Sequence, residues 1–285
     1  EFKSETDLDH ALEEGILIPS YHIRCVVEKP FTKWLKTPVP ENNIQPHLPK
    51  LYLHNIRSVN VEKLEELKLL SNEYDILLLT ESWLTLHKSK LYQINGFTTH
   101  SCCRPRRTGG GVTLYIRDDI PFTVLLDFFN DYVTATWILL RPIMHDPLIL
   151  CLLYHPPNLL KTQKNSTIDH LLSTASKLLA KHTSSKFIIC GDFNDLDTSP
   201  LTMVLPLHQL VDFPTRGNHT LDRIFTDCEE YLNGCEKQPA ILHNDHCSIS
   251  LTPHGYRKCS TYRSVLKHDI TPSAKIKISE ELSNV

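Results

Sequence analysis

Polar side chains that can bind a metal or move a proton lie beside short apolar runs at several points of this sequence. These side chains are Asn55, Glu81, Asp192, Asn194, Asp245 and His246. Apolar runs of this length are typical of buried strands, and strand ends collect at the edge of a sheet. The pattern therefore predicts that groups far apart in the sequence converge on one site.

Carboxylate and amide oxygens are hard ligands, which suit Mg²⁺ and its tendency to keep several waters; Mn²⁺ should substitute because its preferences are similar. A bound cation can stabilise charge on phosphoryl oxygens, while an aspartate orients or deprotonates water for in-line attack. The chain has no signature of P-loop nucleotidases, zinc proteases, serine hydrolases or dinucleotide-binding folds. Hydrolysis of a phosphate ester is the chemistry that these residues favour.

Each of these residues also has an ordinary structural explanation when it is considered alone. Glu81 would suit the first turn of a helix, where an acid interacts well with the helix dipole. Asp192 and Asn194 are common turn residues. Asp222 lies in an apolar run, where an ion pair would explain it, and His246 alone would most often be a surface or core histidine. Only their arrangement in space decides between these explanations.

The spacing of apolar residues predicts an α/β protein with mixed sheets. Helical spacing is present over Val61–Leu70 and Ile168–Leu179. The predicted strands are Leu51–His54, Ile76–Leu79, Val112–Ile116, Tyr132–Leu140, Leu148–Tyr154, Phe187–Cys190, Leu221–Thr226 and Cys247–Leu251. Short turns join some neighbouring strands and helices join others, so we expect both antiparallel and parallel pairs.

The composition, with 41% apolar and 22% charged residues, indicates a folded protein, and no apolar run approaches the roughly 20 residues of a membrane-spanning helix. The nine cysteines form no C-x-x-C pair, so we expect reduced thiols. The N-terminal residues do not resemble a secretion signal. A net charge of −3 gives no general excess of cations for nucleic acid, so binding would depend on basic patches at residues 104–107 and 257–277.

Seven short motifs, in order along the chain, resemble those of the endonuclease/exonuclease/phosphatase superfamily. They are Leu53-His54-Asn55-Ile56-Arg57-Ser58, Leu79-Thr80-Glu81-Ser82-Trp83-Leu84, Gly109-Gly110-Gly111-Val112, Tyr154-His155-Pro156-Pro157, Ile189-Cys190-Gly191-Asp192-Phe193-Asn194, Leu221-Asp222-Arg223-Ile224-Phe225 and Asn244-Asp245-His246. The first two are most similar to the apurinic/apyrimidinic-type endonuclease domains of non-LTR (LINE-type) retrotransposons. The resemblance implies a four-layer α/β sandwich, in which two mixed β-sheets pack face to face and are flanked by helices.

The resemblance also implies a role for each residue of the site. Glu81 would be the principal metal ligand, with Asn55 and Asp245 near the same ion. Asp192 would position or activate the attacking water, and Asn194 would orient the phosphate. The active site would therefore lie where the strands of both sheets end.

Further roles follow from the same resemblance. His246 would bind a phosphoryl oxygen and be oriented by Asp222, while Tyr154 would lie against the scissile phosphate. The cations expected to contact substrate are Arg57, Arg106 and Arg107. Two positions depart from the superfamily pattern: Arg57 stands where repair enzymes carry an aspartate, as in retrotransposon members, and Asn244 replaces a serine but can still form local hydrogen bonds.

The expected organisation is a poorly structured leader (1–48), a catalytic domain (49–253) and a basic tail (254–285) that links to a reverse transcriptase in a parent polypeptide. The implied activity is Mg²⁺-dependent nicking of target DNA for retrotransposition, in the nucleus or cytoplasm, with no membrane partner. Two alternatives stay open: hydrolysis of another phosphate ester, and an inactive remnant that only binds DNA or a protein. Loops near Gly109 and between residues 195 and 220 would decide the substrate.

Overall fold

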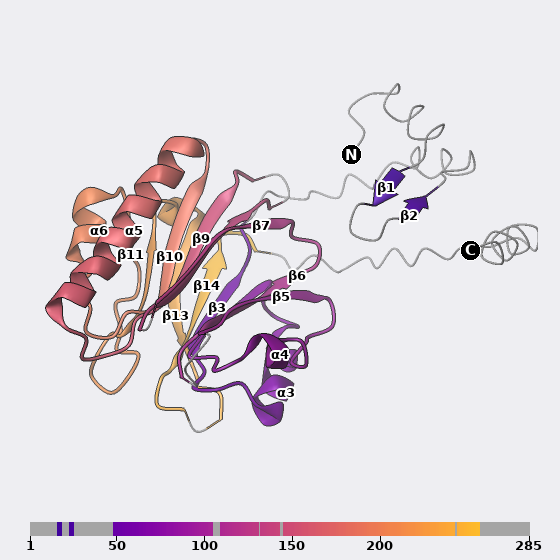
Figure 1. Cartoon of the computed structure of the whole chain (residues 1–285), viewed down its shortest axis with the longest axis horizontal. Coiled ribbons are helices and arrows are strands. Elements are labelled where there is room, and N and C mark those ends of the chain that lie inside the picture. The colour runs from indigo at the N-terminus through magenta and orange to yellow at the C-terminus, as the bar shows by residue number, and fades with distance from the viewer. Residues whose placement is uncertain are drawn as a thin grey trace, which may run out of the picture. The chain divides into compact units, whose positions relative to one another are not determined.

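The computed structural model describes residues 48–104, 109–130, 132–142, 145–242 and 244–256, together with two short strands near the N-terminus (Figure 1). These strands, β1 (Ile16–Ile18) and β2 (Ile23–Cys25), pair antiparallel within a unit spanning Glu1–Pro46, and a second unit begins at His47. The predicted leader and basic tail fall largely outside the described residues. Their organisation stays a prediction.

One six-stranded sheet, here called the β3 sheet, is built from both ends of the second unit. Its order is β13-β14-β3-β4-β6-β5. The strands are β3 (Leu51–Asn55), β4 (Ile76–Thr80), β5 (Phe97–Cys102), β6 (Val112–Arg117), β13 (Leu232–Gln238) and β14 (Ser248–Pro253). Strands β3 and β4 are parallel, whereas β14 runs antiparallel to β3 and aligns Leu251 with Leu51.

The other six-stranded sheet, here called the β10 sheet, is formed by the intervening part of the chain. Its order is β11-β12-β10-β9-β8-β7. The strands are β7 (Phe122–Phe129), β8 (Thr134–Leu140), β9 (Leu148–Tyr154), β10 (Lys186–Asp192), β11 (His208–Gln209) and β12 (Asp222–Thr226). Strands β9 and β10 are parallel and are joined by a helix, while β12 runs antiparallel to β10.

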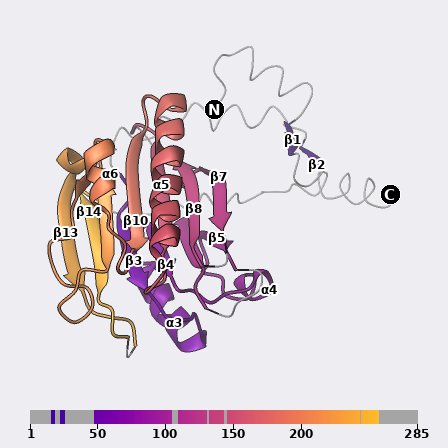
Figure 2. The same cartoon turned by 60° about the vertical axis from the view of Figure 1, so that its left-hand side comes forward.

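The two sheets pack face to face with helices on their outer sides, as Figures 1 and 2 show. The helices are α3 (Val61–Leu70), α4 (Leu86–Ser89), α5 (Lys161–Lys181), α6 (Ser199–Val204) and the 3₁₀ turn η2 (Glu229–Tyr231). Three apolar clusters fill the spaces between the layers, one of them between the two sheets. The predicted four-layer sandwich of two mixed sheets is confirmed.

Burial on both faces explains why the central strands could be predicted. Every residue of β8 and β9 is buried, so β9 appears in the sequence as a continuous apolar run and β8 as an apolar run interrupted only by Thr134 and Thr136. Strands β5, β7 and β13 lie at sheet edges and were not predicted. Their residues are mostly exposed or half-buried, and their sequences lack a continuous apolar run or a strict alternation.

Helix α3 has the predicted bounds, whereas α5 begins at Lys161 rather than Ile168. Its first two turns are mainly polar and solvent-facing, so apolar spacing does not reveal them. The Gln163 side chain marks the true start, because its Oε1 accepts a hydrogen bond from the Leu160 backbone N–H at 2.9 Å. None of the described helices is both long and apolar enough to cross a membrane.

Candidate active site

The β10 sheet places three functional side chains side by side at one end. Asp192, the last residue of β10, is in register with Asp222 on one side and with Tyr154 on the other. All three are buried, and both aspartates are at most 1% exposed. Gly191 lets β10 approach β9 here, since a Cβ atom at this position would lie 1.9 Å from the Leu153 carbonyl oxygen.

The β3 sheet contributes an amide that joins the carboxylates of the two sheets. Asn55, at the end of β3, donates from Nδ2 to Glu81 Oε1 at 3.1 Å and to Asp192 Oδ2 at 2.8 Å. Glu81 follows β4 directly, and its Oε2 accepts a hydrogen bond from Trp83 Nε1 at 3.2 Å. The predicted ligands Asn55 and Glu81 therefore lie together, next to the predicted water-activating residue.

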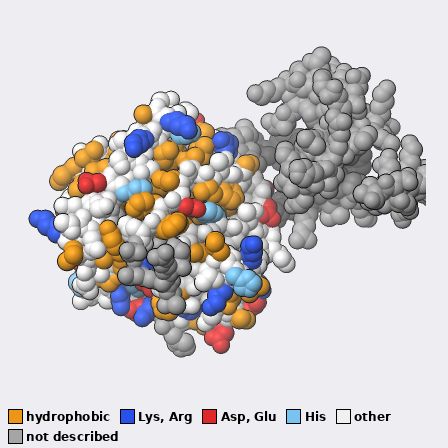
Figure 3. Space-filling view, viewed as in Figure 1, with side chains coloured by type: hydrophobic (Ala, Val, Ile, Leu, Met, Phe, Trp, Pro, Cys, Tyr) orange, Lys and Arg blue, Asp and Glu red, His pale blue; other side chains and the backbone are white. Residues whose placement is uncertain are grey.

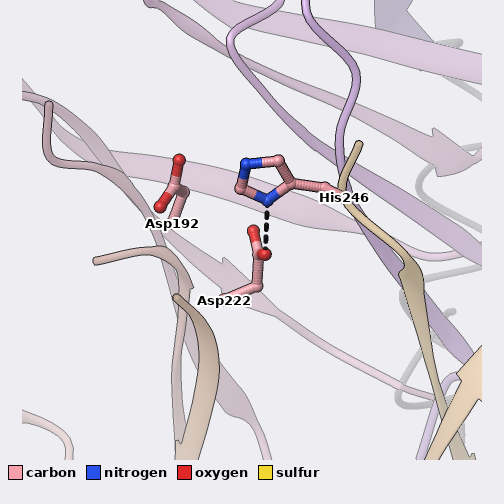
Figure 4. A group of neighbouring side chains, drawn as sticks. All are labelled: Asp192, Asp222 and His246. Carbon is pink, nitrogen blue, oxygen red and sulfur yellow. Dashed lines mark hydrogen bonds and ion pairs between the residues drawn. The ribbon is translucent and has the colours of Figure 1, made fainter. Parts of the chain in front are cut away.

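His246 forms the hydrogen bond to Asp222 that the resemblance implied. Its Nδ1 lies 2.7 Å from Asp222 Oδ2, and both side chains are at most 2% exposed. Because the carboxylate can only accept, Nδ1 is the donor. Figure 4 shows the other ring nitrogen turned to the side on which Asp192 lies. Although burial opposes the charged imidazole, the hydrogen bond and the charge of Asp222 raise the pKa of His246.

Asp192 is a buried carboxylate with a high affinity for a proton. Burial and the neighbouring charge of Asp222 raise its pKa well above the ordinary value, although His246 and the Asn55 hydrogen bond oppose this. Its Oδ1 accepts a hydrogen bond from the backbone N–H of Asn194 at 3.0 Å, and Asn194 Nδ2 donates to the His155 carbonyl at 2.8 Å. The turn therefore fixes Asp192 without neutralising it, which suits a group that accepts a proton from water.

Two groups of side chains at this end could hold a metal ion. Asp192, Asp222 and His246 each offer a ligand atom, and these atoms lie within 4.8 Å of one another. Glu81 and Asp192 offer carboxylate oxygens on either side of Asn55, whose Nδ2 faces both of them and whose Oδ1 accepts a hydrogen bond from the Arg57 backbone N–H at 3.2 Å. Since Nδ1 of His246 is used by Asp222 and its pKa is raised, the imidazole is better suited to donating a hydrogen bond than to binding a cation. The carboxylates of Glu81 and Asp192 are the better match to Mg²⁺, which prefers oxygen ligands.

Asp245, the third predicted ligand, is held by two arginines. Arg57 Nη1 lies 3.0 Å from Asp245 Oδ1, and Arg216 Nη2 lies 2.6 Å from Oδ2. Partial burial raises the pKa of Asp245, but the charges of Arg216 and Arg57 outweigh it and lower the pKa overall. Its place near the metal stays a prediction.

Asn244, which departs from the superfamily pattern, joins the last motif to the first. Its Oδ1 accepts a hydrogen bond from the backbone N–H of His246 at 3.2 Å, and its Nδ2 donates to the Asn55 carbonyl at 2.5 Å. These contacts align β3 with the segment before β14. Asparagine therefore supplies local hydrogen bonds at this position, as expected.

The loops of the site have a strained backbone. Five of the seven non-glycine residues with left-handed φ in the described ranges belong to them: Arg57 (44°), Ser58 (78°), Glu81 (51°), Trp83 (53°) and Asn194 (46°). Such conformations cost free energy and persist where surrounding contacts enforce them. The Gly110 and Gly111 carbonyls do so here, since they accept hydrogen bonds from the backbone N–H groups of Trp83 and Ser82.

The structure excludes some of the local explanations and agrees with others. Helix α4 begins at Leu86, so Glu81 is not a first-turn acid. Asp222 pairs with His246 and not with its neighbour Arg223, whose guanidinium donates to Thr198 and to backbone carbonyls. His246 is buried against two aspartates rather than lying on the surface.

Three residues near the site were assigned no role from the sequence, namely Trp83, Arg104 and Arg216. The Arg104 guanidinium lies 5.3 Å from the centroid of the Tyr154 ring. Burial, with the charges of Glu81 and Asp192, raises the pKa of this tyrosine. Arg104 belongs to the basic patch at residues 104–107, but no contact in the site was predicted for it. The predicted substrate contacts Arg106 and Arg107 lie outside the described residues.

The fold and the site together define a phosphoester hydrolase whose active site lies at the ends of two packed sheets. A model of the Endonuclease/Exonuclease/phosphatase family matches residues 53–231, and the chain belongs to this family. A search of curated proteins found no match.

Several solved structures share the fold. The human Nocturnin catalytic domain with bound sulfate is 17% identical, covers 72% of this chain and 92% of its own, and gives a TM-score of 0.55. The endonuclease domain of TRAS1, a telomere-specific non-LTR retrotransposon, is 14% identical. The match covers 74% of this chain and 100% of that domain, with a TM-score of 0.52. ANGEL2, a 2′,3′-cyclic phosphatase, is 14% identical. The match covers 73% of this chain and 95% of ANGEL2, with a TM-score of 0.53. An endonuclease and a cyclic phosphatase thus resemble this chain to a similar degree in sequence identity and TM-score.

Proposed function

We propose that this chain is a Mg²⁺-dependent endonuclease that nicks DNA for a non-LTR retrotransposon. The observation that carries the proposal is the hydrogen-bonded set from Glu81 through Asn55 to Asp192, with the Asp222–His246 pair beside it. In the proposed parent polypeptide a reverse transcriptase follows, and the enzyme acts in the nucleus or cytoplasm. The sequence motifs around Glu81 and Asn55 support this choice within the family.

Each residue would act through a stated atom. Glu81 would offer an oxygen to Mg²⁺, with Asn55 near the same ion, and the bound ion would stabilise developing charge on phosphoryl oxygens. Asp192 would accept a proton from the attacking water. His246 would donate from Nε2 to a phosphoryl oxygen while Asp222 holds its Nδ1, and Asn194 and Tyr154 would limit where the phosphate lies.

Exposed arginines beside the acidic groups favour a polyanionic substrate. Arg57 and Arg216 have side chains that are 50% and 45% exposed, and both lie against Asp245. On the face shown in Figure 3, the blue Lys and Arg side chains are scattered rather than gathered into one broad basic surface. Binding would therefore depend on these local cations, and affinity for duplex DNA should fall steeply as salt rises.

Incubation of purified protein with supercoiled plasmid, with and without Mg²⁺, tests the proposal. We expect a nicked circle with Mg²⁺ or Mn²⁺, none in excess chelator, and binding without efficient turnover in Ca²⁺. Glu81→Gln should abolish nicking, whereas Glu65→Gln, a surface acid paired with Lys68 on α3, should not. Nicking that persists in chelator would exclude the metal mechanism.

The same assay addresses the two alternatives. If the chain hydrolyses another phosphate ester instead of DNA, it should consume a soluble phosphate ester offered in parallel and leave the plasmid intact. Binding of duplex DNA without any nicking by a folded protein would indicate an inactive remnant. Either result would contradict the proposed endonuclease.

A further inference from the structure

Trp83 is an exposed aromatic residue at the edge of the active site, and no role has yet been assigned to it. Its side chain is 40% exposed. The indole Nε1 donates to Glu81 Oε2 at 3.2 Å, and the backbone N–H donates to the Gly110 carbonyl at 3.0 Å. The ring is therefore anchored at its edge and by its backbone.

Exposure alone would mean little, since single apolar side chains are common on protein surfaces. Two further observations distinguish Trp83. Its φ of 53° is unfavourable for a bulky residue, and the cost is met by the contact with the glycine turn. Its hydrogen-bond partner is the Glu81 carboxylate, whose other oxygen is held by Asn55. The loop thus maintains a strained conformation that keeps an aromatic ring beside the reacting centre.

We propose that the Trp83 indole stacks on a nucleobase next to the scissile phosphate, while its N–H orients the Glu81 carboxylate. This inference rests on the proposed DNA endonuclease function and names a contact that the function requires. A ring held by its edge leaves its faces available, and any base can stack on an aromatic face. The contact would add affinity without specifying a sequence.

The surroundings of Trp83 favour a nucleotide over a compact phosphate ester. Arg57 and Arg216 provide exposed cations for phosphates, and Trp83 provides an exposed aromatic surface on the loop that carries Glu81. Cations that follow a backbone, combined with an aromatic platform, are typical of nucleic-acid binding. A free phosphate would leave the ring face without a partner.

Binding of duplex oligonucleotides in Ca²⁺ or chelator tests the stacking without turnover. Trp83→Leu should weaken binding about 5- to 100-fold, the range that one stacked base supplies. A duplex with an abasic nucleotide beside the mapped cleavage position should bind wild-type protein with a similar loss. Because both changes remove the same contact, the abasic nucleotide should cost Trp83→Leu no further affinity.

Two variants separate stacking from other effects. Trp83→Phe keeps an aromatic face but lacks the N–H, so it should bind DNA as wild type does and need more Mg²⁺ for half-maximal nicking. Tyr231→Leu removes another exposed ring, 42% exposed and at the opposite end of the β3 sheet, and should change neither property. Circular dichroism would verify that each variant is folded.

Two results with folded Trp83→Leu would overturn the stacking contact. One is that it binds intact and abasic duplexes as tightly as wild type does; the other is that the substitution and the abasic nucleotide lower the affinity independently. Wild-type nicking would then persist, and the proposed function would stand. If wild-type protein neither binds nor nicks DNA, the proposed function itself fails and the stacking contact fails with it. The two failures are therefore distinguishable.

Discussion

The two packed sheets carry buried carboxylates at both of their ends, the active-site end and the opposite end. Among the described residues, only at the opposite end is a buried carboxylate bound by an arginine. At the end where β3 begins, the fully buried Asp75 is bound by the Arg117 guanidinium. It also accepts hydrogen bonds from the backbone N–H of Lys50 at 2.9 Å and from the Tyr256 hydroxyl at 3.0 Å. This carboxylate joins three segments of the chain, and its charge is compensated.

At the active-site end, Asp192 and Asp222 are just as buried, yet no Lys or Arg among the described residues is bonded to either carboxylate. A buried anion without a permanent cation is costly. The partner of Asp222 is the imidazole of His246, whose charge depends on its protonation. The same residue type therefore joins segments of the fold where arginine neutralises it, and remains available for chemistry where arginine does not.

The largest expected effect is at the compensated end. Arg117→Ala would leave Asp75 buried without its cation, which costs about 3–5 kcal/mol of the free energy of unfolding. Urea denaturation measures this loss. Arg141→Ala removes an exposed arginine that donates to Thr123 and should change stability by less than about 0.5 kcal/mol. Folded Arg117→Ala should retain wild-type nicking, and a selective loss of activity would contradict the comparison.

Asp192→Asn should show the reverse behaviour. Turnover should fall at least about 100-fold, because an amide cannot accept a proton from water. Stability should be unchanged or higher, since the substitution removes an uncompensated buried charge. Single-turnover nicking and a thermal melt measure the two effects on one preparation. Near-full activity would overturn the role of Asp192.

The difference between the two ends also shows what the sequence could predict. Asn55, Glu81 and Asp192 were found because each ends an apolar run, and His246 because it precedes one. Their convergence follows from parallel pairing of β3 with β4 and β9 with β10. Once those strands are recognised, the architecture is largely determined.

Other contacts had no local signal in the sequence. Arg216 reaches Asp245 only because its backbone bridges to His246, across an irregular loop whose path no periodicity encodes. Trp83 lay within a recognised motif, but the left-handed turn that exposes its ring depends on Gly110, which is distant in sequence. Side-chain pairings of this kind require the tertiary structure.

The Asp222–His246 pair offers a finer test of the uncompensated end. His246→Ala should lower turnover at least about 100-fold, and Asp222→Asn should be milder if it only orients the imidazole. Combining the two should add little to His246→Ala, because residues that act as one unit are non-additive. Nicking rates of the three variants give the result. If the losses of turnover in the two single variants multiply in the double variant, Asp222 and His246 do not act as one unit.

The smallest expected effect is a loss of stability in mild acid. Burial lowers the pKa of His155, next to Tyr154, to about 4, and both ring nitrogens lack a hydrogen-bond partner within the described structure. The unfolded chain therefore binds a proton near pH 6.5 that the folded chain refuses. The stability contributed by the neutral His155 should be complete above pH 6.5 and decrease as pH falls towards 4, by about 1–2 kcal/mol at pH 5.

Denaturant midpoints at pH 7 and pH 5 measure this decrease. His155→Gln should have a smaller decrease than wild type, whereas His208→Gln, at an exposed position, should match wild type. An equal decrease in His155→Gln and wild type would assign the acid sensitivity to other groups.

The alignment of Leu51 with Leu251 between β3 and β14 has a topological consequence. The part of the chain from β3 to β14 is entered and left at neighbouring strand ends, and both lie away from Asn55 and His246. This part of the chain can therefore be joined to other sequences at both ends without disturbing the site. A short peptide could join its two ends into a circular chain, and a domain fused at either end would be tethered on the side opposite the site, so a long polymer could pass across the catalytic groups without meeting the tether.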